Sequence, residues 1–252
     1  MIEQIISRRL RIALPQVQGT VRLLRDGATI PFISRYRKEA TGSLDEVQVG
    51  AVKEQLERLT ELESRRQTIL TTIEEQGKLT PELRRRIEEC WDPVELEDLY
   101  LPYKPKRRTR ATVARERGLE PLADLVMAQR ARDAAQQARR YVSAEVPTPE
   151  DALAGACDII AERISENEQA RNGLRRTFAR EGVVHTKVVK GKEAEGAKYS
   201  DYFDAATPLR SISSHRFLAM RRGADEGVLK ITIDIDADRC IEGLCRQFIR
   251  PG

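Results

Sequence analysis

Apolar residues recur three and four positions apart along most of this chain, which is the spacing of helices that bury one face. The longest stripe consists of Val47, Val52, Leu56, Leu59, Leu62, Ile69, Leu70 and Ile73. It follows Ser43 and Glu46, whose S-x-x-E spacing is that of a capping box, and it ends at Gly77. A helix of about thirty residues is on the order of 45 Å long, so we expect it to serve as a spine.

Shorter helices are predicted before this spine. Two of them open the chain, one ending before Pro15 and the other at Gly27. The next segment holds Phe32, Ile33 and Gly42, which favour a tight, packed turn. This turn also carries a small basic set beside an aromatic residue, namely Arg35, Tyr36, Arg37 and Lys38. These cations could extend a phosphate-binding track, but a packed turn is the better explanation of the segment.

Two helix N-termini marked by proline are predicted after the spine. Thr80-Pro81 and Asp92-Pro93 each place a capping side chain before a proline, which is well tolerated in the first turn of a helix. Two short helices joined by a tight turn are therefore expected over residues 81–100, as a helix-turn-helix-like pair. We expect more short helices after Thr109 and from about residue 121.

The second half of the chain mixes helices with strands. The loop SAEVPTPED is the best candidate boundary, and it divides the chain into domains 1–147 and 148–252. Apolar and polar residues alternate at 228–236, and a second β-favouring run lies at 183–189, so we expect a small two-stranded sheet. The predicted fold is a mainly α array of helices. Its last helix has an apolar face, formed by Ile241, Leu244 and Phe248, that no following element covers. This pattern favours a natural chain that continues.

Composition adds few constraints. The chain has 252 residues, 44 basic and 40 acidic, so its net charge of +4 decides little. No apolar run approaches the roughly 18 residues of a membrane span, and the N-terminus does not resemble a signal peptide, so a cytoplasmic location is expected. The four cysteines form no CxxC pair.

The distribution of charge is more informative than its total. The segment from Lys104 to Arg117 contains seven basic residues and one acidic residue. Its cations would suit phosphate oxygens, and two preceding tyrosines could stack on unpaired bases. The candidate nucleic-acid-binding residues are therefore Tyr100, Tyr103, Lys104, Lys106, Arg107, Arg108, Arg110 and Arg115. The alternative is a solvated basic face that is neutralised by three upstream acidic residues, Glu95, Glu97 and Asp98. The two interpretations weigh about equally.

Other candidate sites are weaker. A second basic set at Arg171, Arg175, Arg176 and Arg180 is better explained by solubility. His185 and His215 have no catalytic partners at a recognised spacing. The acidic run that starts at Asp234 lacks the glycine and glutamate of a calcium loop. Without a phosphate-binding loop, we expect no cofactor, no metal and no enzymatic activity.

Three stretches of the sequence closely resemble the N-terminal region of the Tex family. They are IPFISRYRKEATGSLDEVQ, the segment from IEEQGKLTPELRRR to ARERGLEPLADL, and GAKYSDYFDAATPLRSISSHRFLAMRRG. The resemblance implies a longer cytoplasmic transcription accessory protein, in which a YqgF-like domain, helix-hairpin-helix elements and an S1 domain follow. It also implies that residues 81–100 are the helix-turn-helix-like part and that 100–111 are its basic exit loop.

Two hypotheses about function follow from the sequence. In the first, the chain is a nucleic-acid-associated scaffold that binds the RNA or DNA backbone without sequence specificity, supports the downstream domains and contacts the transcription machinery. In the second, it is a purely structural or protein-interaction module that braces the YqgF-like and S1 domains.

Overall fold

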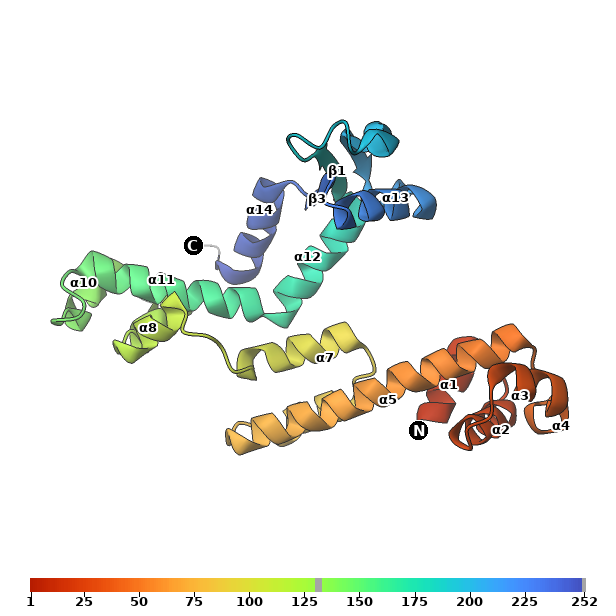
Figure 1. The fold of residues 1–252 in the computed structure, drawn as a ribbon. Helices are drawn as coiled ribbons and strands as arrows, with labels where there is room; N and C mark the ends of the chain where they lie inside the picture. Colours follow the sequence, from red (N-terminus) through yellow and green to blue (C-terminus); the bar gives the residue numbers. More distant parts are fainter. Residues whose placement is uncertain (130–132, 251–252) are drawn as a thin grey trace. The chain divides into compact units, whose positions relative to one another are not determined.

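The computed structural model describes residues 1–129 and 133–250, and most of this length is helical (Figure 1). The predicted mainly α fold is therefore confirmed. Two compact units divide between Lys104 and Pro105. The boundary expected at 147/148 lies inside the second unit, and as a domain boundary it stays a prediction.

The first unit is built around the predicted spine, α5 (Glu46–Glu75). The spine packs with α1 (Ile2–Leu10), α2 (Leu14–Arg25) and α3 (Ile30–Tyr36), and the short α4 (Lys38–Thr41) packs on α2. Its buried face includes most of the predicted stripe, but Val47, in the first turn of the helix, is 81% exposed.

The capping box of α5 lies two residues later than the sequence suggested. Asp45 Oδ1 accepts a hydrogen bond from the Gln48 amide at 2.7 Å, and Gln48 Oε1 accepts one from the Asp45 amide at 3.1 Å. Ser43 has a left-handed backbone with φ of 65°, next to Gly42 at the end of α4. It therefore belongs to the turn and cannot cap the following helix.

The predicted helix pair after the spine is confirmed as α6 (Pro81–Glu89) and α7 (Pro93–Tyr100). As expected, Thr80 and Asp92 cap these helices by accepting hydrogen bonds from backbone amides. The buried Arg66 of α5 donates to the Glu88 carbonyl at 2.5 Å and lies 4.2 Å from the Trp91 ring centroid. This arginine ties the turn between the two helices to the spine. A 3-10 turn, η1 (Leu101–Tyr103), follows them.

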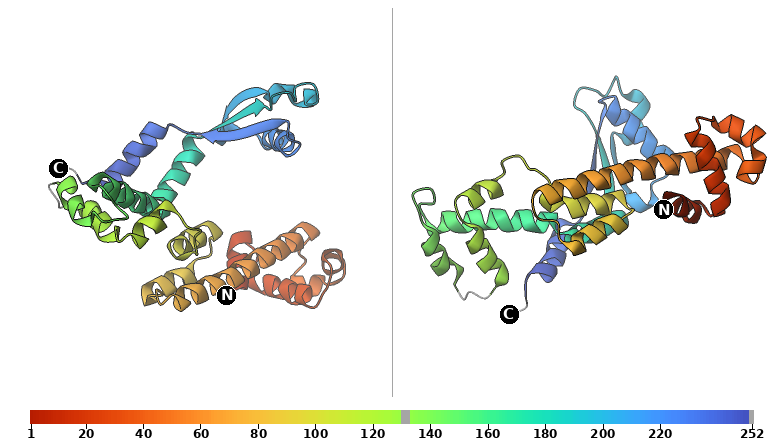
Figure 2. Two further views of the ribbon diagram at one scale, coloured as in Figure 1. Left: turned by 60° about the vertical axis from the view of Figure 1, so that its left-hand side comes forward. Right: turned by 90° about the horizontal axis from the view of Figure 1, so that it is seen from below.

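The second unit begins with short helices that pack on one longer helix. They are α8 (Arg110–Glu116), α9 (Glu120–Ala128), α10 (Ala134–Ala138) and η2 (Arg139–Tyr141), and the longer helix is α11 (Pro149–Glu166). Thr148 caps α11, as the sequence predicted. Small residues of α8 and α11 are buried between these helices, so the helices approach closely. From the end of α11, α12 (Glu168–Glu181) leads to the sheet (Figures 1 and 2).

The sheet has three antiparallel strands where two were expected. Its order is β2-β1-β3, with β1 (Val183–Val188) between β2 (Asp204–Pro208) and β3 (Leu229–Asp234). The predicted pairing of β1 with β3 is confirmed. The sequence of β2, DAATP, lacks the large alternating apolar residues that would reveal a strand.

Three further elements complete the second unit. They are η3 (Ala197–Tyr202), η4 (Leu209–Ser211) and α13 (Ser214–Asp225), and α13 packs on β3. The last helix, α14 (Ala237–Phe248), contacts α12. Its apolar face is partly covered, since Leu244 and Phe248 are half-buried while Ile241 is 56% exposed.

The side-chain amide of Gln129, at the end of α9, binds the backbone at the C-terminal end of α14. Its Nε2 donates to the Phe248 carbonyl at 2.6 Å, and its Oε1 accepts from the Arg250 amide at 2.8 Å.

Among the described residues, no helix is long and apolar enough to cross a membrane.

Candidate nucleic-acid interface

The basic stretch starts at the end of the first unit and continues into α8 of the second. Lys104 ends the first unit, and an irregular segment reaches Thr109. The Thr109 hydroxyl accepts a hydrogen bond from the Thr112 amide at 3.1 Å, so the predicted cap of α8 is confirmed. The candidate residues therefore fall into two groups, one in each unit.

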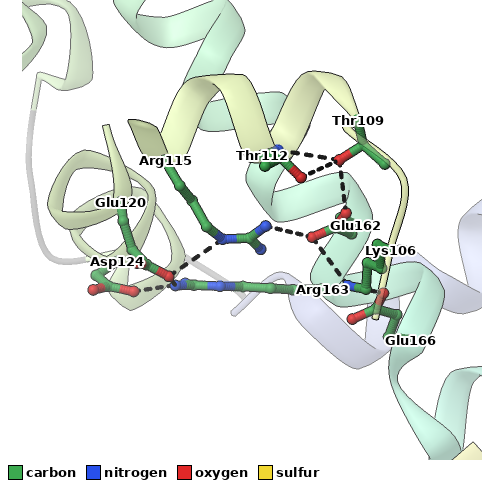
Figure 3. A network of polar contacts seen from close by, with 9 residues as sticks. All are labelled: Lys106, Thr109, Thr112, Arg115, Glu120, Asp124, Glu162, Arg163 and Glu166. Carbon is green, nitrogen blue, oxygen red and sulfur yellow. Dashed lines mark hydrogen bonds and ion pairs between the residues drawn. The ribbon is translucent and has the colours of Figure 1, made fainter. Parts of the chain in front are cut away.

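Two of the cations converge on one carboxylate of α11 (Figure 3). Lys106 Nζ lies 3.3 Å from Glu162 Oε2, and Arg115 donates to the same oxygen at 2.6 Å. The Thr109 hydroxyl donates to the other oxygen, Glu162 Oε1, at 3.1 Å. Lys106 also pairs with Glu166, one turn further along α11. Because both glutamate side chains are largely covered, at 11% and 14% exposed, these contacts fasten the segment to α11.

The same network reaches α9. Arg163 of α11 pairs with Glu120 at 2.9 Å and with Asp124 at 2.6 Å, and Arg115 Nε lies 3.5 Å from Glu120. Figure 3 shows these side chains joining three helices through one continuous set of contacts.

Burial of Glu162 opposes ionisation, but the hydrogen bonds and charges of Arg115 and Lys106 outweigh it and hold the pKa of Glu162 below its ordinary value. Glu162 is therefore ionised at neutral pH and binds both cations. Lys106 and Arg115 are thus already paired within the second unit, and phosphate would have to compete with a largely covered carboxylate.

Both tyrosines of the candidate set belong to the first unit. Tyr100 is 6% exposed, and the Arg65 guanidinium lies 5.1 Å from its ring centroid. Tyr103 packs against the core of the first unit, and its carbonyl accepts a hydrogen bond from Gln76. Their rings are therefore used in packing.

The remaining cations are exposed. Arg108 pairs with Glu116 at 2.9 Å, where its side chain is 69% exposed, and Arg110 lies 3.4 Å from Asp158, where its side chain is 89% exposed. Lys104 and Arg107 are also exposed, and Arg107 has no ion pair with any residue that the structure describes. These side chains are accessible to an external anion.

A groove of about 740 Å³ lies between α8 and α11. Its wall on the α8 side carries Arg108, Arg110 and Arg117, and the sequence analysis did not include Arg117 among its candidates. Acidic residues stand on the other side, at Glu145, Asp151 and Asp158. The groove itself is therefore of mixed charge, and the arginines on its rim form its positive part.

Sequence reasoning also missed the acidic partners of the basic stretch. The upstream carboxylate Glu97 pairs with Arg65 at 2.6 Å and has Lys104 as a further charge partner, whereas Lys106 meets Glu162 and Glu166. Their spacing of four residues places them on one face of α11, which was the available signal. Nothing in that spacing identifies the segment they face.

The other candidate chemistry remains dispersed. Across residues 1–129 and 133–250, no three histidine, cysteine, aspartate or glutamate side chains are arranged to hold a metal ion. The expectations of no cofactor and no enzymatic activity remain predictions.

Comparison with known proteins gives two family matches. Residues 1–74 match the Tex-like protein N-terminal domain, and residues 129–250 match the Tex central region-like family. The transcriptional accessory protein Tex of Neisseria gonorrhoeae is 47% identical over 237 residues, which are 94% of this chain and 31% of that protein.

Two further relatives agree with these matches. The protein tex of Bordetella pertussis is 49% identical over 225 residues, covering 88% of this chain and 28% of the relative. The human S1 RNA-binding domain-containing protein 1 is 28% identical over 259 residues, covering 98% of the chain and 25% of the relative. The chain thus spans about a third of the length of the curated relatives it matches. Its helical first unit and its central region place it in the Tex family.

Proposed function

We propose that this chain is a helical scaffold of a Tex-type transcription accessory protein, and that Arg107, Arg108 and Arg110 contact the backbone of RNA or DNA. The observation that carries the proposal is the division of the basic stretch by exposure. The side chains of Lys106 and Arg115 are 26% and 31% exposed and bind covered carboxylates, whereas those of Arg108 and Arg110 are 69% and 89% exposed.

Exposure decides how readily a cation exchanges its partner. An ion pair in water contributes about 0–1 kcal/mol, so phosphate can replace Glu116 or Asp158 at little cost. Arg107 needs no exchange, because it has no ion pair among the described residues. These cations lie on an irregular segment and a single short helix. Since phosphates are the same at every nucleotide, such contacts favour binding without sequence specificity.

The relatives are consistent with this role. The name of the human relative includes an S1 RNA-binding domain, and that of the gonococcal relative includes transcriptional accessory protein. The relatives extend well beyond this region, so we propose that it positions nucleic acid and the transcription machinery for the rest of the protein.

The test is charge reversal at Arg107, Arg108 and Arg110, with binding to single-stranded RNA and to duplex DNA measured over a salt series. The matched control reverses three exposed arginines of the first unit, Arg8→Glu, Arg58→Glu and Arg85→Glu. Both variants change the net charge by the same amount, so the comparison separates local contacts from the overall field.

We expect the Arg107/Arg108/Arg110 variant to lose most of its affinity. The slope of log affinity against log salt for single strands should fall by about 0.7 for each phosphate contact removed. Equal affinity of the two triple variants would refute this assignment of residues.

A second candidate function is a brace for neighbouring domains, and the paired Lys106 and Arg115 favour it. In that case the basic stretch serves to fasten the segment to α11. No binding of RNA or DNA by the wild-type chain would favour this second function.

A further inference from the structure

Helix α3 presents two aromatic side chains to solvent. Phe32 and Tyr36 are one turn apart, and they are 45% and 69% exposed. Their ring centroids lie 5.7 Å apart with an angle of 41° between the ring planes. Ile33 and Ser34 are buried on the opposite side of the helix. The packed turn expected from the sequence is therefore a helix with an exposed aromatic face.

Packing of the first unit does not account for this face. Ile33 is fully buried and Ile30 partly buried in the first core, so they anchor α3 to the unit. The two rings leave apolar surface in water, where burial would gain about 25 cal/mol per Å². The two rings contact each other, so their exposed surface forms one small apolar patch.

The charge around the rings is positive. Residues 31–39 contain three cations and one carboxylate, Glu39, which gives a net charge of +2. Arg37 donates to Glu39 at 2.7 Å, so this carboxylate already has a partner. Arg35 follows Phe32 by three residues and lies on the same exposed face of α3, and Lys38 is also exposed. Arg35 therefore lies on the face of the rings, and Lys38, the first residue of α4, follows Tyr36 by two residues.

We propose that Phe32, Tyr36, Arg35 and Lys38 form a surface that binds single-stranded nucleic acid. Bases stack on aromatic side chains whatever their sequence, and cations beside the rings hold the phosphates. The rings are tilted relative to one another, so two successive bases can use both rings only where the strand is free to bend. A flexible single strand meets this condition, whereas a duplex keeps its bases stacked on each other.

This surface extends the proposed function to the first unit but does not depend on Arg107, Arg108 and Arg110. A single strand supplies both requirements of the surface, because each nucleotide carries a flat base and a negative charge. A protein partner would need an acidic and aromatic surface of matching spacing. The charge therefore favours nucleic acid over a protein as the occupant.

The test uses the 252-residue chain and a fluorescently labelled oligouridine of about twelve nucleotides, a length within the site sizes of such proteins. Changing both rings, Phe32→Ala with Tyr36→Ala, should weaken binding about tenfold for each ring. Val47→Ala is the matched control, since Val47 is an 81% exposed apolar residue of the same unit. Circular dichroism of the variants would show that the helices remain folded.

A fluorescent variant gives a readout that does not depend on a loss of affinity. Phe32→Trp keeps a flat ring and should preserve affinity, and its fluorescence should be quenched when a base stacks on it. The signal of Trp91, the one natural tryptophan, is subtracted with the wild-type chain. Unchanged affinity of the double alanine variant together with no quenching would overturn the proposal and leave a protein surface as the occupant.

Comparing the Phe32/Tyr36 variant with the Arg107/Arg108/Arg110 variant separates the two proposals. If only the Arg107/Arg108/Arg110 variant loses affinity, the aromatic surface is refuted and the proposed function stands. If only the Phe32/Tyr36 variant loses affinity, the aromatic surface stands and the proposed phosphate contacts of Arg107, Arg108 and Arg110 are refuted. A wild-type chain that binds no oligonucleotide would refute both.

Discussion

Replacing Glu162 by glutamine tests whether the basic stretch is fastened inside the protein. Glu162 accepts hydrogen bonds from Arg115 at 2.6 Å and from Thr109 at 3.1 Å, and it pairs with Lys106 at 3.3 Å. Glutamine has almost the same shape, so the substitution removes the charge and leaves the packing of α11 unchanged. It also places a donor group among the cations, and one of these contacts becomes unfavourable.

The magnitude follows from burial. Removing one partner of a fully buried ion pair costs about 3–5 kcal/mol, and a pair in water is worth about 0–1 kcal/mol. The Glu162 side chain is 11% exposed, but those of its cations are 26% and 31% exposed, so we expect about 2 kcal/mol. For a unit of this size, Tm should fall by about 4–8 °C.

Scanning calorimetry and hydrogen exchange of α8 would measure this effect. Glu116→Gln is the matched control, because Glu116 pairs with Arg108 where both side chains are more than half exposed. We expect that control to change the free energy of unfolding by less than about 0.5 kcal/mol. Faster exchange of the α8 amides in Glu162→Gln would show that the fastening is local.

The effect should also depend on pH. Because the folded protein holds the pKa of Glu162 below its unfolded value, its contribution is complete above the unfolded pKa, about 4.3, and is lost as pH falls through the folded pKa. The difference between wild type and Glu162→Gln should therefore shrink in acid. Equal stability of Glu162→Gln and Glu116→Gln at neutral pH would refute the reasoning.

Two further predictions concern the first unit. Asp45→Ala should destabilise it by about 1 kcal/mol, because the N-cap of α5 is lost, and Ser43→Ala should have a much smaller effect; urea unfolding of both variants checks this. Gly19→Ala should cost more than about 2 kcal/mol, since its Cβ would lie 1.9 Å from the backbone oxygen of Ala40; thermal unfolding would refute this if Tm were unchanged.

Much of the fold could be predicted because helix starts are local. A capping side chain accepts a hydrogen bond from a backbone amide only two or three residues further along the chain. The caps Thr80, Asp92, Thr109 and Thr148 were therefore recognisable in the sequence. The third strand was not, because it has no apolar alternation of its own and its place depends on pairing with β1. The cap of α5 was misplaced because two acceptors, Ser43 and Asp45, stand close together and only the backbone angle at Ser43 separates them.

The candidate site was predicted less completely. Charge density identified the basic stretch, but local sequence carries no information about which cations meet α11, about 50 residues away. The same limit applies to aromatic residues. Tyr100 and Phe32 look equally suited to packing or to binding, and only the tertiary fold buries the first and exposes the second.

The two hydrogen bonds of Gln129 have a mechanical consequence. They join residues 129 and 248–250, which are also the ends of the region that matches the Tex central region. A pulling force applied between these ends would act first on the two hydrogen bonds. The first resistance of the region to stretching therefore comes from one amide side chain.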